Sequence, residues 1–169
     1  MGLADVFPGT YLPRTHGALE VIEHPRAMAH EGRQWTATFK HTNTAATATA
    51  VLITTPATGD YILNIDVETS VATQWFFSEA PSATTTGGST VTGLCNNRTD
   101  DNTDPFTLTS TPTYATAGTV LEQHQSATIV GGKGEVDNVW VLAQSTTYIV
   151  RAASPSGATT IINLFYNGD

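Results

Sequence analysis

Apolar and polar side chains alternate with a period of two along several segments of this chain. The clearest segment is Tyr61–Glu68, in which the odd-numbered positions are apolar and most even-numbered positions are polar. Residues 34–40 repeat the pattern, with Trp35, Ala37 and Phe39 between polar neighbours. Successive side chains of a β-strand point to opposite faces, so the alternation predicts strands with one buried and one solvated face.

The last part of the chain contains three further apolar runs, rich in β-branched and aromatic residues. They are Val139–Leu142, Thr147–Arg151 and Thr160–Tyr166, separated by short links that hold Ser, Thr, Gly and Pro. Such residues favour the pleated, half-buried surface of a sheet. We therefore expect the chain to close with three antiparallel strands.

Shorter patterns predict the remaining strands. They lie at Val51–Ile53, Ala72–Ser78, Val91–Leu94, Phe106–Thr111, Thr119–Leu121 and Ala127–Val130. Pro56 and Gly59 separate two closely spaced strands, which predicts a hairpin across Thr55–Asp60. The total is about eight to ten short strands with essentially no helix.

These elements predict an all-β fold, an antiparallel β-sandwich formed by residues 34–169. Eight strands in two sheets are typical of a jelly roll, which protects its sheet edges well. An immunoglobulin-like sandwich also fits the strand count, although its Cys…Trp…Cys pattern is absent.

Residues 1–33 differ from the rest, and we interpret them as an extended N-terminal arm. Pro8, Pro13 and Pro25 prevent a continuous helix and favour extended backbone. A disordered tail is the alternative, but the segment holds more apolar bulk than a solvated linker needs. Its apolar side chains are Val6, Phe7, Tyr11, Leu12, Leu19, Val21 and Ile22.

The charge balance excludes one large class of partner. The chain has 15 acidic and seven basic residues, which gives a formal net charge of −8. Because binding to phosphates relies on Lys and Arg, we expect no nucleic-acid partner. No apolar run approaches the roughly 18 residues of a membrane-spanning helix, and no signal peptide is visible, so we expect no membrane partner either.

Charged residues are only 13% of the chain, about half the usual share, and threonine replaces them. A surface rich in hydroxyl groups is expected. The single Cys95 excludes an internal disulfide framework, and in a strand it is typical of a small buried side chain.

The loop Asn96–Pro105 holds the main cluster of oxygen ligands, including Asp100, Asp101 and Asp104. Calcium takes six to eight such oxygens, but the spacing and the closing Glu of an EF-hand are missing. A solvated surface loop is the favoured interpretation. The five histidines are too scattered for a zinc or iron site; they are His16, His24, His30, His41 and His124.

No pattern of catalytic residues stands out. No serine lies in a Gly-x-Ser-x-Gly turn, and Gly131–Gly134 lacks the order of a phosphate-binding loop. The carboxylates that could pair in space are Asp66, Glu68, Glu79 and Glu122, and nothing in the sequence favours such a pair. We therefore expect no enzyme activity, no cofactor and no metal site. Trp35, Trp75 and Trp140 are expected in the core, with a sugar-stacking platform as the alternative.

A set of motifs near the C-terminus resembles a known family. They are Trp140-x-Leu142, Thr147-Tyr148-x-Val150-Arg151, Ser156-Gly157 and Ile162-x-Leu164-x-Tyr166, with looser agreement at Arg33-x-Trp35-x-Ala37, Val51–Pro56 and Asn96–Arg98. Between about residues 33 and 166 the chain resembles the small jelly-roll proteins encoded near head genes of tailed bacteriophages. These are head decoration, or cement, proteins that brace neighbouring capsomers, commonly as trimers.

The resemblance implies a structural virion protein that lies on the outer capsid surface and binds the major capsid protein and copies of itself, as a homotrimer. The arm lies outside the resemblance. Our own hypothesis is that it becomes ordered on the capsid and contributes the anchors Phe7, Tyr11, Leu12 and Leu19. The alternative function is a carbohydrate- or receptor-binding β-sandwich module of a virion. A small carboxylate hydrolase is a weaker third hypothesis.

Overall fold

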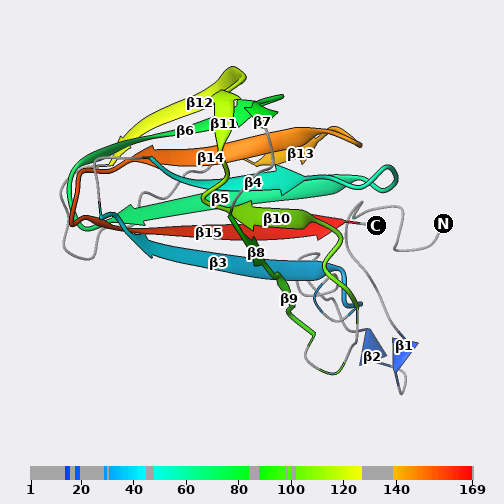
Figure 1. The fold of residues 1–169 in the computed structure, drawn as a ribbon. Coiled ribbons are helices and arrows are strands. Elements are labelled where there is room, and N and C mark those ends of the chain that lie inside the picture. Colours follow the sequence, from blue (N-terminus) through cyan, green and yellow to red (C-terminus); the bar gives the residue numbers. More distant parts are fainter. Residues whose placement is uncertain are drawn as a thin grey trace.

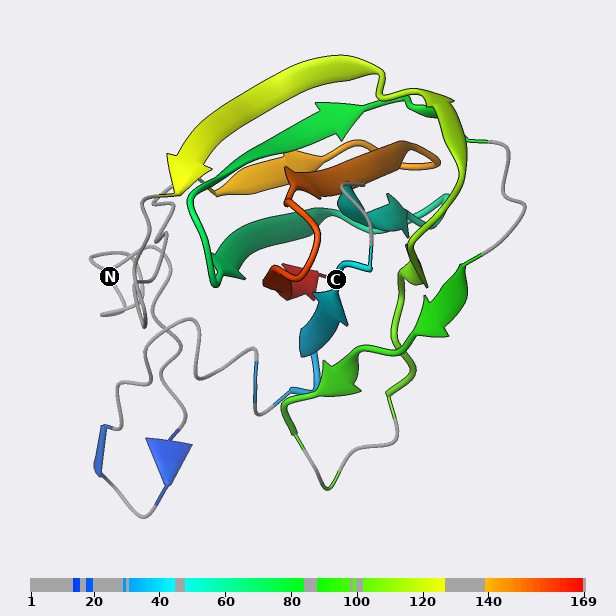
Figure 2. The ribbon, with the colours of Figure 1, turned by 60° about the vertical axis from the view of Figure 1, so that its left-hand side comes forward.

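Two antiparallel β-sheets packed face to face form the body of the molecule (Figures 1 and 2). The computed structural model describes residues 14–15, 18–19, 29, 31–44, 48–83, 88–97, 99, 102–126 and 139–168. The predicted all-β antiparallel sandwich is confirmed. Within the described residues, no helix is long and apolar enough to cross a membrane.

One sheet has six strands and the other has five. The six-stranded sheet runs in the order β12 (Thr119–Ser126), β6 (Thr73–Glu79), β14 (Thr147–Ala153), β4 (Thr49–Thr54), β10 (Thr107–Ser110) and β8 (Ser89–Val91). The five-stranded sheet runs in the order β13 (Trp140–Leu142), β5 (Tyr61–Thr69), β15 (Thr159–Gly168), β3 (Gln34–Thr42) and β9 (Leu94–Cys95).

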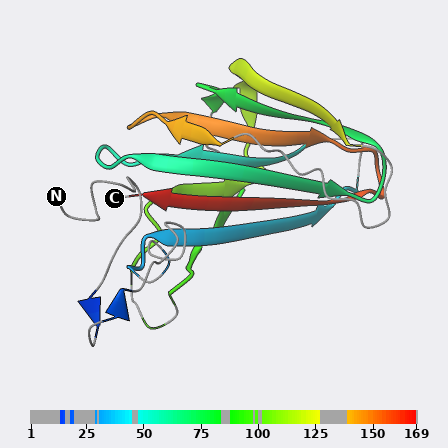
Figure 3. The same ribbon diagram turned by 180° about the vertical axis from the view of Figure 1, so that it is seen from behind.

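Two short ribbons complete the described strands. β7 (Ser82–Ala83) pairs with β11 (Tyr114–Thr116), and β1 (Arg14–Thr15) pairs with β2 (Ala18–Leu19). Figures 1 and 3 show the β1–β2 ribbon beyond the end of the sandwich at which β3 begins and β15 finishes. We call this end of the sandwich the entry pole.

Eight of the strands are connected as a jelly roll. The first half of the domain pairs with the second half in mirror order: β3 with β15, β4 with β14, β5 with β13, and β6 with β12. Strands β3 to β6 alternate between the two sheets, and β13 to β15 alternate back again. The chain is therefore one long hairpin wound into two layers, which is the jelly-roll arrangement.

The predicted hairpin across Thr55–Asp60 is wrong, because β4 and β5 lie in different sheets. After β4 the backbone continues to pair with the segment before β14. The Thr55 N–H donates to the Thr146 carbonyl (3.0 Å), and the Ser145 N–H donates to the Pro56 carbonyl (2.9 Å). The link therefore crosses from one sheet to the other as a β-arch. The same turn residues are compatible with an arch and with a hairpin.

Other expectations are corrected in detail or lie outside the described part. The single strand expected at Val91–Leu94 is two strands in different sheets, β8 and β9. The expected strand at 119–121 extends to Ser126 as β12, and the closing strands are confirmed as β13, β14 and β15. The strand expected at 127–130 falls outside the described residues.

The main core lies between the sheets and is rich in aromatic side chains. Its largest fully buried members include Trp75, Phe77 and Tyr166. A second, small core lies on the outer side of the six-stranded sheet, where Tyr114 of β11 packs on Ala50, Leu52 and Ile149. Strand β4 is therefore buried on both faces, which explains its continuous apolar run.

Candidate functional site

The outer face of the five-stranded sheet carries a strip of exposed apolar side chains. The structure exposes six large apolar side chains among its described residues, and four of them lie on this face. They come from four different strands: Val141 (75% exposed), Leu94 (57%), Phe165 (43%) and Ile62 (38%). Burial of such side chains against a partner is favourable, so an exposed apolar group on one face indicates an interaction surface.

The register of the sheet brings these four side chains into two neighbouring rows. Val141 lies opposite Ile62 in one row, and Phe165 lies opposite Thr36, which lies opposite Leu94, in the next. We call Val141, Ile62, Phe165, Thr36 and Leu94 the apolar strip. It crosses the whole sheet at the entry pole, on the side that faces the viewer in Figure 3.

No charged side chain interrupts these two rows. The other outward positions in them are the amides Gln34, Asn64 and Asn167. Charge begins in the next rows, with Asp66, and then with Glu68 and Lys40 on either side of Ile161. Depletion of charge combined with an aromatic residue is the composition of a protein–protein interface core.

A polar row borders the apolar strip. The Thr38 hydroxyl donates to Asn163 Oδ1 (2.9 Å), and Asn163 Nδ2 lies 3.4 Å from Asp66 Oδ2. At the other end of β3, the hydroxyls of Thr42 and Thr159 are hydrogen-bonded across the strands at 2.9 Å. The threonines expected on the surface therefore fix neighbouring strands to one another, whereas the four large apolar side chains of the strip have no hydrogen-bonding group.

The apolar side chains on the outer face of one sheet are covered by the chain itself, and those on the outer face of the other sheet are exposed. The six-stranded sheet has its small outer core covered by Tyr114 of the chain's own β11. On the five-stranded sheet, the strip side chains remain exposed in the described part of the chain. The difference marks the strip as the candidate site.

The strip ends in a hollow beside β9. This depression has a volume of about 430 Å³ and is lined by Thr36, Thr38, Thr92, Leu94, Cys95 and Asn96. Inside it the Thr36 hydroxyl donates to Asn96 Oδ1 (3.0 Å). A hollow with apolar walls and hydroxyl groups suits an aromatic side chain, including one with a polar tip.

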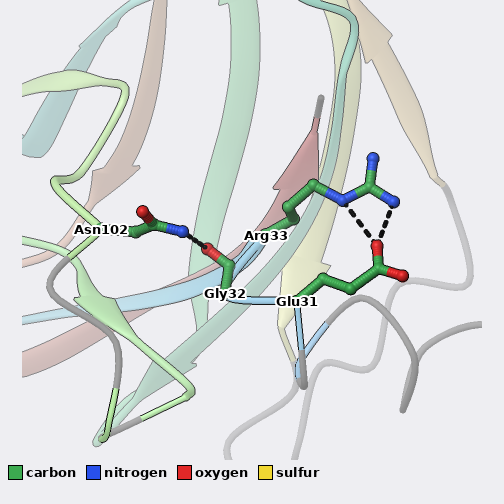
Figure 4. Close-up of polar contacts among 4 residues, drawn as sticks. All are labelled: Glu31, Gly32, Arg33 and Asn102. Atoms are coloured by element: carbon green, nitrogen blue, oxygen red, sulfur yellow. Dashed lines mark hydrogen bonds and ion pairs between the residues drawn. The ribbon is translucent and has the colours of Figure 1, made fainter.

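The arm is fixed to the domain next to this strip. Asn102 Nδ2 donates to the Gly32 carbonyl (2.9 Å), and the Gly168 N–H donates to the Arg33 carbonyl (3.2 Å). Figure 4 shows the first contact together with the ion pair between Arg33 and Glu31, in which Arg33 Nε lies 2.9 Å from Glu31 Oε2. Gly32 has a φ of 68°, a left-handed conformation that favours glycine. The arm therefore leaves the domain from a defined position at the entry pole.

The predicted anchors of the arm are largely outside the described part. Phe7, Tyr11 and Leu12 lie outside the described residues, and for Leu19 the structure describes the backbone, which pairs with Arg14 in the β1–β2 ribbon. Their role in partner binding stays a prediction.

The carboxylate of Asp104 holds the loop 96–105 to the core. Its Oδ1 accepts hydrogen bonds from the Tyr166 hydroxyl (2.7 Å) and the Phe106 N–H (2.9 Å), and its Oδ2 accepts one from the Gly93 N–H (2.6 Å). A Cβ at Gly93 would overlap the Tyr166 hydroxyl, so this close approach requires glycine. Burial, reinforced by Asp104, raises the pKa of Tyr166 above its usual value of 10.0.

Asp104 therefore acts as an acceptor for three protein donors. It is half-buried, so at this position the loop differs from the solvated surface loop that we expected. Asp100 and Asp101 lie outside the described residues. Among the residues that are described, no three His, Cys, Asp or Glu side chains gather as metal ligands.

A buried carboxylate, Glu122, lies between the edges of the two sheets. Its Oε2 accepts a hydrogen bond from Trp140 Nε1 (2.7 Å), and its Oε1 is paired with His124 Nε2. The His124 ring stacks on Trp75, with ring centroids 5.1 Å apart. Glu122 and His124 are two residues apart on β12 and lie on the same face of the strand, where Glu122 is buried and His124 is exposed at the edge. The scattered histidines and carboxylates of the sequence gave no sign of this pair.

This group, Glu122, His124 and Trp140, connects β12 of one sheet to β13 of the other, and we call it the edge clasp. The three tryptophans are distributed through the protein interior. Trp35 and Trp75 are buried in the main core, and Trp140 is half-buried in the clasp. The expected core positions of Trp35 and Trp75 are confirmed. The buried thiol of Cys95 is also confirmed.

Comparison of the chain with protein-family models, with curated proteins and with solved structures found no match. The resemblance to head decoration proteins therefore remains a prediction from the motifs.

Proposed function

We propose that this chain is a decoration, or cement, protein that binds the outer surface of a tailed-phage head and braces neighbouring capsomers. The observation that carries the proposal is the uncharged apolar strip beside the fixed attachment of an apolar arm. Both lie at one pole of a stiff jelly roll, so one partner surface can engage both. The family motifs supply the identity of that partner, the major capsid protein.

Bracing requires no chemistry at a reaction centre. A protein that binds the assembled shell but not its separate subunits stabilises the shell by mass action. A rigid body with an adhesive pole meets that requirement, and a homotrimer formed about a closed axis would bridge several capsomers at once. Residues 1–33 provide the anchors, and the strip provides a preformed contact.

Cosedimentation with purified, undecorated heads tests the proposal. Full-length protein should sediment with the heads, and deletion of residues 2–24 should abolish binding because the arm anchors are lost. Absence of binding by the full-length protein would reject the function. Unchanged binding after the deletion would reject the role of the arm.

Charge substitution tests the strip itself. Phe165→Asp or Leu94→Asp should weaken head binding at least about tenfold, because a carboxylate would be desolvated in the contact. Val120→Asp is the matched control, since Val120 is exposed to a similar degree (46%) but lies on the six-stranded sheet. Equal losses in all three variants would show that the strip has no special role.

The carbohydrate-binding alternative loses its main support from the positions of the tryptophans. Two of the three are in the core, so they offer no stacking platform. A glycan array with and without chelator remains the direct measurement, and sugar binding without head binding would favour the alternative.

A further inference from the structure

The apolar strip is long and narrow, and its dimensions limit what can cover it. Five strands spaced about 4.8 Å apart give a length of roughly 20 Å, and two rows of side chains give a width of roughly 10 Å. The resulting area of about 200 Å² is far below the roughly 800 Å² that each partner buries in a stable complex. The strip alone is thus too small to hold a second folded copy, but it is as wide as one extended peptide.

The chain carries a segment that matches this shape and charge. Residues Val6–Leu12 read Val-Phe-Pro-Gly-Thr-Tyr-Leu, with four large apolar or aromatic side chains and no charged residue. Seven extended residues span about 23 Å, the length of the strip. An uncharged segment on an uncharged strip leaves no ionic group to be desolvated.

The segment is also within reach. The arm is fixed at Gly32 and Arg33, at the same pole as the strip. Outside the β1–β2 ribbon, roughly 15 residues lie between Leu12 and Arg33, and they can extend to roughly 50 Å, more than twice the length of the strip. A tethered segment has an effective concentration in the millimolar range, so it outcompetes a free peptide of equal affinity at micromolar concentration.

We propose that residues Val6–Leu12 lie across the apolar strip of their own domain in the free protein, with one aromatic side chain in the hollow beside β9. The arm anchors and the strip then cover each other until a partner binds. This contact is a property of the free protein. Its consequence, that docking exchanges the cover for the shell, rests on the proposed function.

Chymotrypsin cleavage of the free, full-length protein tests the contact. The reporter is the Tyr11–Leu12 bond, because Pro8 and Pro13 prevent cuts after Phe7 and Leu12. When opening is fast, the cleavage rate follows the population of the uncovered arm. Leu94→Lys and Phe165→Lys should each speed cleavage about tenfold, since an amino group on the strip disfavours the apolar cover.

Val120→Lys is the matched control, because it adds the same charge at an exposed position on the other sheet. It should leave the rate unchanged, and thermal unfolding should show that all three variants remain folded. Equal cleavage rates in the wild type and both strip variants would overturn the proposal.

Dilution separates the chain's own arm from the arm of a neighbour. A rate that is constant between 1 and 100 µM, on the order of the range where weak complexes form, supports the cover within one chain. A rate that falls as the concentration rises would assign the cover to a second copy and overturn the proposal as stated. The assay contains no heads, so its result is independent of the cosedimentation experiment.

Discussion

At the scale of single residues, Tyr166 connects the core to the loop at the entry pole. Its ring stacks on Phe106 with centroids 4.4 Å apart, and it lies 6.1 Å from the ring of Trp35. Its hydroxyl is buried and donates to Asp104, whose other oxygen holds Gly93. Through Asp104, this side chain thus fixes the residue before β10 and the β8–β9 link, and Thr92 of that link lines the hollow.

Tyr166→Phe should lower the free energy of unfolding by about 1–2 kcal/mol, because a buried hydrogen bond to a carboxylate is lost while the ring still packs. Urea unfolding followed by tryptophan fluorescence measures the change. Tyr114→Phe, which removes a hydroxyl from the half-buried side chain on the small outer core, is a suitable control. A change equal to that of the control would show that the hydroxyl contributes nothing.

The raised pKa of Tyr166 also makes stability depend on alkaline pH. Burial first, and then Asp104, keep this tyrosine protonated in the folded state, while the unfolded chain titrates near 10. Its contribution is therefore complete below pH 10 and is lost as the pH rises further, by up to about 1.4 kcal/mol per pH unit. The pKa of Tyr148 is raised as well, chiefly by burial. Unfolding midpoints between pH 8 and 11 should fall in the wild type and fall less steeply in Tyr166→Phe; parallel curves would contradict the assignment.

At the scale of elements, the strands were predictable and their partners were not. Alternation predicts β3 and β5, and β-branched runs predict β14 and β15. These strands are predictable because the order of apolar and polar side chains within a strand shows whether one or both of its faces are buried. The partner of β4 depends on where the other strands pack, so Pro56 and Gly59 could not distinguish an arch from a hairpin. Gly93 likewise divides the expected Val91–Leu94 strand between two sheets because of its contacts with Asp104 and Tyr166.

In the sequence, the apolar strip was visible only as apolar residues at positions where the alternation calls for polar ones. Ile62 and Phe165 occupy outward positions in strands whose other outward positions are mostly polar. Their assembly with Leu94 and Val141 depends on the register of four pairings between strands far apart in the chain. Position in sequence therefore gave no sign that the four side chains are neighbours.

The edge clasp joins two elements that do not pair, β12 and β13, and it gives a prediction at this scale. Glu122→Ala should lower the free energy of unfolding by about 2–3 kcal/mol, because the indole N–H of Trp140 loses its buried acceptor. Glu122→Gln should cost less, since the amide oxygen can still accept from the indole. Chemical denaturation of both variants measures the difference. Equal losses would show that the volume of the side chain, and not the hydrogen bond, matters.

At the scale of the whole molecule, the wound hairpin makes nearly every strand pairing distant in sequence. Gln34 pairs with Asn167, and Thr73 with Ser126. The chain loses the conformational entropy of closing these long loops before the sheets can pack. All-β chains with such distant contacts therefore fold slowly. Stopped-flow refolding from urea should give a main phase of about milliseconds to seconds. A main phase completed in microseconds would contradict the mirror-order pairing.

The same winding brings the beginning and the finish of the β-domain together, because the Arg33 carbonyl and the Gly168 N–H are hydrogen-bonded. A foreign peptide fused after Asp169 would therefore emerge at the entry pole, beside the apolar strip, where the proposed function places the contact with the shell. The turn that contains Gly157 lies at the opposite tip, beyond Thr42 and Thr159, and a Cβ there meets open space. If the proposed function holds, an epitope or enzyme to be displayed on a particle would best be inserted into that turn, at the opposite end of the sandwich from the entry pole.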